Sequence, residues 1–517
     1  MLLQRFYAKR DRLVTISSVL DQLPISEYKL SQLLTSINRD LDKIQYSNHS
    51  QITTPEKNVL KGENITKTVL NEIRLVYLKR SVLFALFQYN FLQSKMVSKA
   101  TFMKKHFISK TKFYSTEVQL RSILNDSDFY NSPNIVNNYE YVLRLHIFEF
   151  FYTAFNGIDS PFEDLNVKIN NLIIRIQAQF SFLIKPVQKS KLEIFLKVWI
   201  LRMQNGHYIN DRIIPPAHVT PAVREKLTSI QKFIEDQFNC KLRGEENNYL
   251  YTFLLTQEYV DGLQDVLTKD DYPLAYDLSD QLINALKTEG GLSDPDSFDT
   301  TQLYKNLSRI HLQFITLYIE PTTFISLDQI NFFKQTYPIF HAIINHFILQ
   351  VKDKNMMHLN KRESANLYFD YMFAFINTIP REMVLDKVHI CVDFSQGSLY
   401  NNYITNTLKG FANANIVIES NLTRATDIYL SDFYSTAVKK AQIIWRNPPS
   451  PDDWGALGDT IIHYKQEKVQ NLVGKISALN GEDLNDVWTS IVIIQASHWT
   501  RHDPNHVGLF VGRSSQC

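Results

Sequence analysis

Residues 98–124 read SKATFMKKHFISKTKFYSTEVQLRSIL and hold five lysines, one arginine and a single glutamate. This local excess of positive charge stands out in a chain with 55 Lys+Arg and 53 Asp+Glu. Ser98 and Ser109 are both suited to accept hydrogen bonds from the free N–H groups of a helix's first turn. The stretch therefore predicts a short helix after Ser98 and a longer one after Ser109, joined by a turn near Phe107 and Ile108.

The second predicted helix has two distinct faces. Its inner, apolar arc on the 3.6-residue wheel contains Phe113, Leu120, Ile123 and Leu124. Its outer face contains Lys110, Thr111, Lys112, Tyr114, Ser115 and Val118. The preceding helix adds Lys99, Lys104 and Lys105. This pattern favours a helix-turn-helix whose second helix enters the major groove while lysines contact phosphates. A basic, solvated helical hairpin would show the same pattern.

A stretch near the N-terminus, VTISSVLDQLPISEYKLSQLLTSINRDLDKI at 14–44, follows the same logic. Thr15 or Ser17 can cap a short helix ending near Leu23, and Ser26 can cap a longer one. The expected core stripe of that longer helix is Leu30, Leu33, Leu34, Ile37 and Leu41. The expected outward face is Tyr28, Lys29, Gln32, Thr35 and Arg39. A polar hairpin is expected at 51–62, where a winged variant has its wing, with Pro55 and Gly62 as breaks.

Bulk properties narrow the class of protein. Few glycines (15) and abundant Leu, Ile, Phe, Lys and Gln favour helices. Three scattered cysteines predict neither a disulfide framework nor a thiolate zinc site, so we expect a reducing, cytoplasmic location. No apolar run approaches the ~20 residues of a membrane span. Residues 1–160 carry 21 Lys+Arg against 14 Asp+Glu. A basic first third is typical of a polyanion-binding end, although chance scatter would also produce it.

The remainder divides into two patterns. Residues 161–382 are almost entirely helix-periodic, with breaks at IIPPAHVTP, KTEGGLSDPDS and NTIPRE. From about residue 386, short β-branched runs (VHICVDF, NIVIES, DIYLSDF, AQIIWRN) alternate with helical segments, which predicts a small, largely parallel sheet. The tail carries His498, His502 and His506, but Pro504 interrupts a helix there, so we expect no metal site.

The order of these parts resembles the Mga/AtxA/RofA group of virulence-type transcription regulators of Gram-positive bacteria. The resemblance implies a mainly α, multidomain chain. Its expected parts are a first winged helix-turn-helix (1–65), a second helix-turn-helix (66–160), two helical bundles similar to PTS-regulation domains (161–290 and 291–382), an α/β domain similar to enzyme IIB (383–478) and a tail of unknown role (479–517).

The resemblance also implies histidine phosphorylation by the phosphocarrier HPr. His207, at the polar end of an apolar helix, is the best candidate, and its alternative is an ordinary surface or capping histidine. Weaker candidates are His311, His341, His346 and His358, for which a core or surface role is the simpler interpretation. In a working enzyme IIB the phosphocysteine follows the first strand. Here that loop reads SQGSLY, and Cys391 falls inside the strand, so we expect no phosphotransfer there.

We therefore expect a cytoplasmic, sequence-specific DNA-binding regulator, an activator that works as a dimer or larger oligomer. Its expected partners are promoter DNA, RNA polymerase, a second copy of the chain and HPr, with no cofactor and no membrane. No enzyme motif is present: the chain lacks a Walker loop, GxGxxG, HExxH and GxSxG. Two alternatives stay open, an RNA-binding antiterminator and a phosphotransfer protein of the sugar-uptake system.

Overall fold

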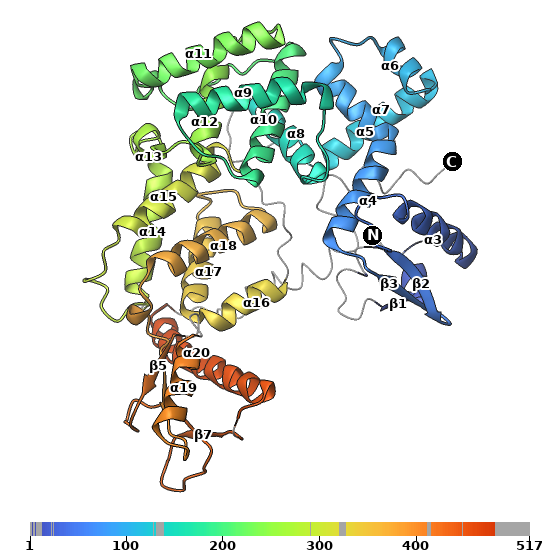
Figure 1. Cartoon of the computed structure of the whole chain (residues 1–517). Coiled ribbons are helices and arrows are strands. Elements are labelled where there is room, and N and C mark those ends of the chain that lie inside the picture. The colour runs from blue at the N-terminus through green and yellow to red at the C-terminus, as the bar shows by residue number, and fades with distance from the viewer. Residues whose placement is uncertain are drawn as a thin grey trace. The chain divides into compact units, whose positions relative to one another are not determined.

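The computed structural model describes residues 3, 6, 13–21, 23, 25–127, 129–130, 139–289, 291–319, 327–410, 415–446 and 448–480. These residues form two compact units, one up to Val266 and the other from Leu267 (Figure 1). The predicted tail lies beyond Asn480 except for its first two residues, so its three histidines fall outside the described residues. No helix within the described ranges is long and apolar enough to cross a membrane.

The first unit begins with a small sheet and two helices. Strand β1 (Leu13–Thr15) leads into α2 (Ile16–Leu20), and α3 (Glu27–Leu41) precedes strands β2 (Gln51–Glu56) and β3 (Val59–Glu63). The antiparallel order is β1-β3-β2, with Val14 opposite Leu60 and Ile52 opposite Gly62. These residues, drawn in dark blue in Figure 1, enclose a common apolar core that includes Val14, Leu30 and Leu41.

The expected hairpin at 51–62 is confirmed, but its turn lies at Lys57 and Asn58 rather than at the expected breaks. Pro55 lies inside β2, which is an edge strand with a register shift between Thr53 and Glu56, a position where a missing N–H is tolerated. Gly62 lies inside β3. A Cβ at this position would come within 2.6 Å of Phe6, which explains why the residue is a glycine.

A run of helices follows. These are α4 (Lys67–Arg80), α5 (Val82–Gln88), a π-helical turn at Tyr89–Gln93, α6 (Lys99–Lys105), α7 (Lys110–Asp126) and α8 (Tyr139–Phe155). Helix α7 packs on α5, and α4 packs on α8. Helix α8 buries an aromatic stripe that includes Phe148, Phe151 and Phe155. The unit is completed by α9 (Asn166–Phe180), α10 (Pro186–Gln204), α11 (Pro221–Phe238), α12 (Glu246–Thr256) and α13 (Leu263–Val266).

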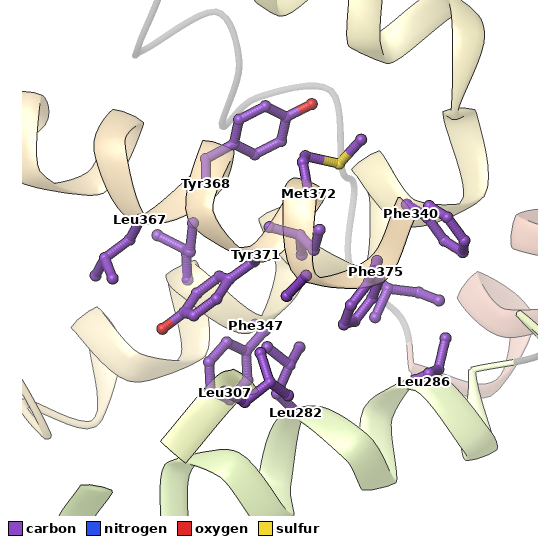
Figure 2. Close-up of a cluster of buried hydrophobic side chains, with 14 of the residues drawn as sticks. Leu282, Leu286, Leu307, Phe340, Phe347, Leu367, Tyr368, Tyr371, Met372 and Phe375 are labelled. Atoms are coloured by element: carbon purple, nitrogen blue, oxygen red, sulfur yellow. The ribbon is translucent and has the colours of Figure 1, made fainter. Parts of the chain in front are cut away.

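The second unit opens with a helical bundle of α14 (Pro273–Thr288), α15 (Thr301–Thr316), α16 (Leu327–Thr336), α17 (Pro338–Asp353) and α18 (Lys361–Thr378). Figure 2 shows its core, where Leu282 and Leu286 of α14 face aromatic side chains of α17 and α18. The division expected at 290/291 thus falls inside this unit, since α14 packs against α15 and α17.

The same unit ends in an α/β domain. Strands β4 (Val388–Val392), β5 (Ile416–Glu419), β6 (Ile428–Ser431) and β7 (Ala441–Ile444) form a parallel sheet in the order β5-β4-β6-β7. Helices α19 (Ser398–Lys409) and α20 (Pro451–Asn480) both pack against β4. The expectation of a mainly helical, multidomain chain with a small parallel sheet toward its C-terminal end is confirmed.

Candidate nucleic-acid interface

Helix α3 presents the predicted polar face to solvent. Its N-cap is Ser26, whose hydroxyl accepts a hydrogen bond from the Lys29 N–H at 3.3 Å, as predicted. The residues predicted to face outward are all exposed: Tyr28, Lys29, Gln32, Thr35 and Arg39. The tyrosine ring is 74% exposed. The face that the sequence assigns to DNA is therefore open to solvent in the folded chain.

Two of these side chains are already oriented by a contact between them. Gln32 Nε2 donates to the Tyr28 hydroxyl at 2.9 Å, one helical turn away. The bond uses one of the two amide N–H groups of Gln32 and leaves the other N–H and the carbonyl oxygen available. A glutamine amide in that state can still form a bidentate pair with an adenine edge.

Polar contacts and a narrow apolar stripe attach α3 to the rest of the first unit. The Asn38 side chain exchanges two hydrogen bonds with the backbone of Ile52 on β2, at 2.8 and 2.9 Å. Arg80 of α4 donates to the buried carboxylate of Asp40 at 2.9 Å. Burial works to raise the pKa of Asp40, but the hydrogen bond and charge of Arg80 outweigh it and lower the pKa below its ordinary value.

One residue of the predicted α3 stripe was assigned wrongly. Leu33 is 37% exposed, whereas Leu30 and Leu41 are buried and Leu34 and Ile37 are half-buried. Leu33 lies about 60° around the helix axis from Leu30, at the edge of the stripe. Strand β2 and helix α4, which pack against α3, cover only the narrower central arc.

Helices α6 and α7 begin where the sequence predicts. The Ser98 hydroxyl accepts from the Thr101 N–H, and the Ser109 hydroxyl accepts from the Lys112 N–H, both at 3.1 Å. All four side chains of the predicted inner arc are buried: Phe113, Leu120, Ile123 and Leu124. The opposite side chains are exposed: Lys110, Thr111, Lys112, Tyr114, Ser115 and Val118.

An aromatic core supports α7 from beneath. The Phe113 ring lies edge-on to Phe102 of α6 at a centroid distance of 5.9 Å and to Tyr89 at 6.2 Å. The Phe102 and Tyr89 rings are themselves 4.5 Å apart. Because aromatic side chains bury large apolar areas in fixed geometries, this cluster sets the angle between α6 and α7.

The lysines of this region differ in whether a carboxylate or an aromatic ring contacts their ammonium group. Lys104, Lys105, Lys110 and Lys112 are exposed, and none has an ion-pair partner among the described residues. Lys99 is held more closely, with its ammonium 4.0 Å from a carboxylate oxygen of Glu117 and 5.4 Å from the ring centroid of Tyr114. The four uncompensated charges create a positive field around the start of α7.

His207, the leading phosphorylation candidate, follows the end of α10. Its N–H donates to the Arg202 carbonyl at 3.1 Å, and its own carbonyl accepts from Arg144 Nη2 at 2.9 Å. Burial lowers the pKa of His207, and the nearby charge of Arg202 lowers it further. The imidazole is therefore neutral near pH 7, which is the form that can act as a nucleophile.

The weaker histidine candidates occupy three different environments. His311 is fully buried, hydrogen-bonded to Ser279 and Tyr371, and burial lowers its pKa to about 3. His341 is also buried, with a pKa lowered by burial to about 3. His346 pairs with Glu289 at 2.8 Å, and His358 is exposed. A phosphoryl donor would have no direct access to the first two in this conformation.

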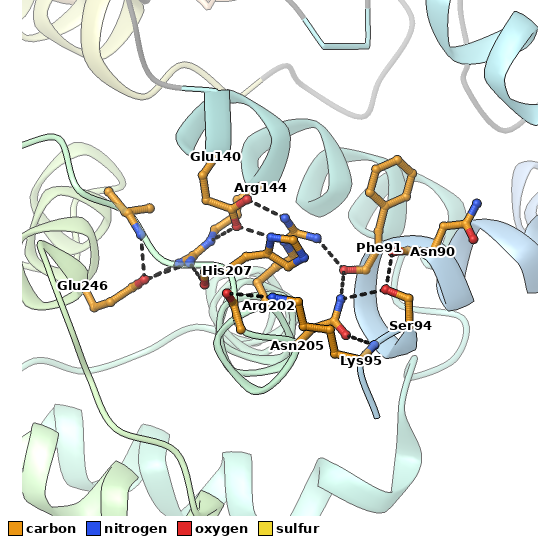
Figure 3. A network of polar contacts seen from close by, with 12 residues as sticks. Asn90, Phe91, Ser94, Lys95, Glu140, Arg144, Arg202, Asn205, His207 and Glu246 are labelled. Atoms are coloured by element: carbon orange, nitrogen blue, oxygen red, sulfur yellow. Dashed lines mark hydrogen bonds and ion pairs between the residues drawn. The ribbon is translucent and has the colours of Figure 1, made fainter. Parts of the chain in front are cut away.

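The sequence prediction missed a buried polar network around His207 (Figure 3). Arg144 of α8 forms two hydrogen bonds with Glu246 of α12, at 2.7 and 2.8 Å. Arg202 of α10 pairs with Glu140. Arg144 and Arg202 lie within the apolar runs YVLRLHIFEFF and KVWILRM, and this was the available signal, because a charge inside a buried helix needs a partner.

The network reaches the element that precedes α6. Arg202 Nη1 donates to the Phe91 carbonyl at 2.5 Å, and Asn205 Oδ1 accepts from the Lys95 N–H at 2.8 Å (Figure 3). Asn205 Nδ2 also lies 3.3 Å from the hydroxyl of Ser94. The C-terminal end of α10, where His207 follows, is thus bonded to the segment that leads into the lysine-rich helices.

Cys391 is unsuited to phosphotransfer. It lies inside β4 and is only 2% exposed, and burial raises the pKa of its thiol to about 11. The thiolate that phosphoryl transfer requires is therefore disfavoured. The loop after β4 contacts a carboxylate instead: Asp432, which follows β6, accepts a hydrogen bond from the Ser395 N–H at 2.8 Å.

No known family matches the chain, and no curated protein matches it either. The described residues include no group of three or more His, Cys, Asp or Glu side chains that could hold a metal ion.

Proposed function

We propose that the chain is a sequence-specific, DNA-binding transcription regulator, an activator that works as a dimer or larger oligomer. The observation that carries the proposal is that α3 and α7 expose their predicted polar faces to solvent. Each is a serine-capped helix with one face buried in the first unit and the predicted polar face open to solvent. Two such faces, rich in hydroxyls, amides and cations, suit the edges and phosphates of duplex DNA.

The elements around α3 support a winged helix-turn-helix. The α2–α3 pair would place α3 in the major groove, and the β2–β3 hairpin would act as the wing beside it. The α6–α7 pair would form the second reading unit, with Lys104, Lys105, Lys110 and Lys112 on phosphates. Lys99 would join them after release from Glu117.

The contacts around His207 support a route for regulation. Phosphorylation of a neutral imidazole adds about 1.5 to 2 negative charges. At His207 that charge would lie beside Arg144 and Arg202, which already hold Glu246 and Glu140. Competition for these guanidinium groups would loosen α10 from the segment before α6. HPr would supply the phosphate, and RNA polymerase would be the activator's partner at the promoter.

The proposal is tested by footprinting the intact protein on duplex DNA from its own upstream region, at low salt. Protected half-sites at a regular spacing are the expected result. An equal-length RNA hairpin serves as the competitor. Displacement by the RNA but not by unlabelled duplex would favour the antiterminator alternative instead. No protection and no mobility shift at low salt would contradict DNA binding.

The regulatory part has a separate test. His207→Asp should mimic the added charge and change self-association and promoter output, whereas His207→Ala should not respond to the phosphate donor. Sedimentation measures the first property and a promoter fusion the second. His463→Ala, at an exposed histidine that is not a phosphorylation candidate, is the matched control. If both His207 variants behave as wild type, phosphorylation at this position plays no part.

A further inference from the structure

The turn between α6 and α7 has an unusual residue at its key position. Helix α6 ends with His106 as its C-cap, and the Ile108 N–H donates back to the Met103 carbonyl at 3.1 Å. This bond pattern is that of a Schellman motif, whose C′ residue adopts a left-handed conformation and is usually glycine. Here the C′ residue is Phe107, with φ 53°.

Phe107 gains no packing in return for this conformation. Its side chain is 96% exposed, and with Leu183 it is one of the two most exposed large apolar side chains in the described part of the chain. Phe162 also has a positive φ, but its ring packs 5.0 Å from that of Phe151. For Phe107, no ring contact is formed within the described ranges. Backbone strain and exposed apolar area therefore coincide at one residue, without an intramolecular benefit.

The surroundings of Phe107 indicate the chemistry of a partner. Lys104 and Lys105 lie three and two residues before it, and Lys110 lies three residues after it. Because consecutive Cα atoms are 3.8 Å apart, the backbone of these lysines lies within about 12 Å of Phe107. All three ammonium groups lack an ion-pair partner among the described residues. An apolar ring inside a cationic border fits a polyanion that also exposes flat, apolar surfaces.

We infer that Phe107 is a direct DNA contact, an apolar wedge that lies against sugars or bases while the neighbouring lysines hold the phosphates. The inference rests on the proposed DNA-binding function and adds a turn residue to the predicted contact set. Apolar side chains that enter between base steps are a known way to bind and bend a duplex. The strained turn would hold the ring outward before DNA arrives, so that little ordering is needed on binding.

The test uses Phe107→Asn in the full-length protein, because asparagine tolerates a positive φ without the flexibility of glycine. Fluorescence anisotropy with a footprinted duplex should show affinity reduced about tenfold, the effect of losing one aromatic–base contact. The slope of log K against log salt should stay unchanged, because no charge is removed. The melting temperature should rise by about 2 °C, since the strain is relieved. Phe107→Trp should retain tight binding.

Leu183→Asn is the matched control, because this residue is 97% exposed in the same unit and lies between α9 and α10 rather than between the lysine-rich helices. It should leave DNA affinity unchanged. Equal DNA affinity for wild type and Phe107→Asn would overturn the inference, and loss of promoter output alone would then assign Phe107 to a protein partner. A lowered melting temperature would also overturn it by making the residue part of the fold. Failure of the wild type to bind duplex DNA would instead reject the proposed function.

Discussion

Helix α3 adds directional polar contacts to its apolar stripe, whereas helix α7 rests on aromatic rings. Asn38 and Asp40 bond α3 to its neighbours through directional hydrogen bonds. Phe113 anchors α7 through ring packing with Phe102 and Tyr89. Their outer surfaces differ as well, since the α3 face centres on the Tyr28–Gln32 pair and the α7 region on lysines.

This difference suggests that the two helices have different roles in DNA binding. A fixed amide on a polar face is suited to base readout, in which geometry decides. Mobile, uncompensated lysines are suited to phosphates, where charge matters more than direction. We therefore expect α3 to contribute more to sequence preference and the α6–α7 region more to total affinity.

Phe113→Ala should destabilise the α6–α7 region by about 3–5 kcal/mol, because it removes a fully buried ring and leaves a cavity. Denaturant unfolding monitored by hydrogen exchange in α7 measures the loss. Val118→Ala, on the exposed face of the same helix, should change stability by less than about 0.5 kcal/mol. Similar effects from the two variants would show that α7 does not rest on this core.

Arg80→Ala should lower the free energy of local unfolding of α3 by about 1–3 kcal/mol, because the buried carboxylate of Asp40 loses its cation. Exchange rates of α3 amides report the change, and α7 amides should be unaffected. Lys79→Ala, at a cation of the same helix α4 that pairs with Asp159 and not with α3, serves as a comparison variant. If α3 exchange is unchanged, the apolar stripe alone holds the helix.

Gln32→Ala should reduce discrimination against a substituted adenine in the binding site by about 1–3 kcal/mol, the value of one bidentate pair. Competition binding with duplexes changed at single positions measures this. Affinity for random-sequence DNA should change little. A uniform loss across all duplexes would instead make Gln32 a phosphate contact and would remove the contrast with α7.

Lowering the pH should reduce the local stability of α3 before that of α7. A carboxyl with a folded pKa below its ordinary 3.8, as at Asp40, stabilises the fold above that pH and loses the contribution as the pH falls. At pH 3 the loss is at most about 1 kcal/mol, because one pH unit corresponds to about 1.4 kcal/mol. The protection factors of the α3 amides, which are the exchange rates corrected for the intrinsic effect of pH, should therefore fall between pH 5 and pH 3 while those of the α7 amides do not, and the opposite order would contradict the assigned anchors.

The local features of both helices could be predicted from sequence because capping and amphipathicity depend on neighbouring residues. Ser26, Ser98 and Ser109 each cap the helix that was expected to follow. The four apolar residues of the α7 inner arc were predicted for the same reason, but the buried Thr116 beside them was not. Leu33 was assigned to the buried stripe wrongly, because the elements that pack against α3 decide how wide its buried stripe is, and the helix alone does not show this.

Features that depend on tertiary packing could not be predicted. The pairing of Arg144 with Glu246 joins residues 102 positions apart. The association of α14 with later helices depends on how the chain folds back after Thr288. Phe107 illustrates a third limit, because its left-handed conformation is typical of glycine and no rule of composition places a phenylalanine there.

A salt titration tests the central claim most directly. The affinity of the intact protein for its footprinted duplex is measured from low to high salt, for wild type and for Lys110→Ala combined with Lys112→Ala. Lys232→Ala combined with Lys241→Ala, two exposed lysines elsewhere in the first unit, is the control. We expect a steep fall of log K with log salt, and a slope about 1.8 smaller in the α7 variant only. Binding that is indifferent to salt, or a slope that the α7 lysines do not change, would contradict the account.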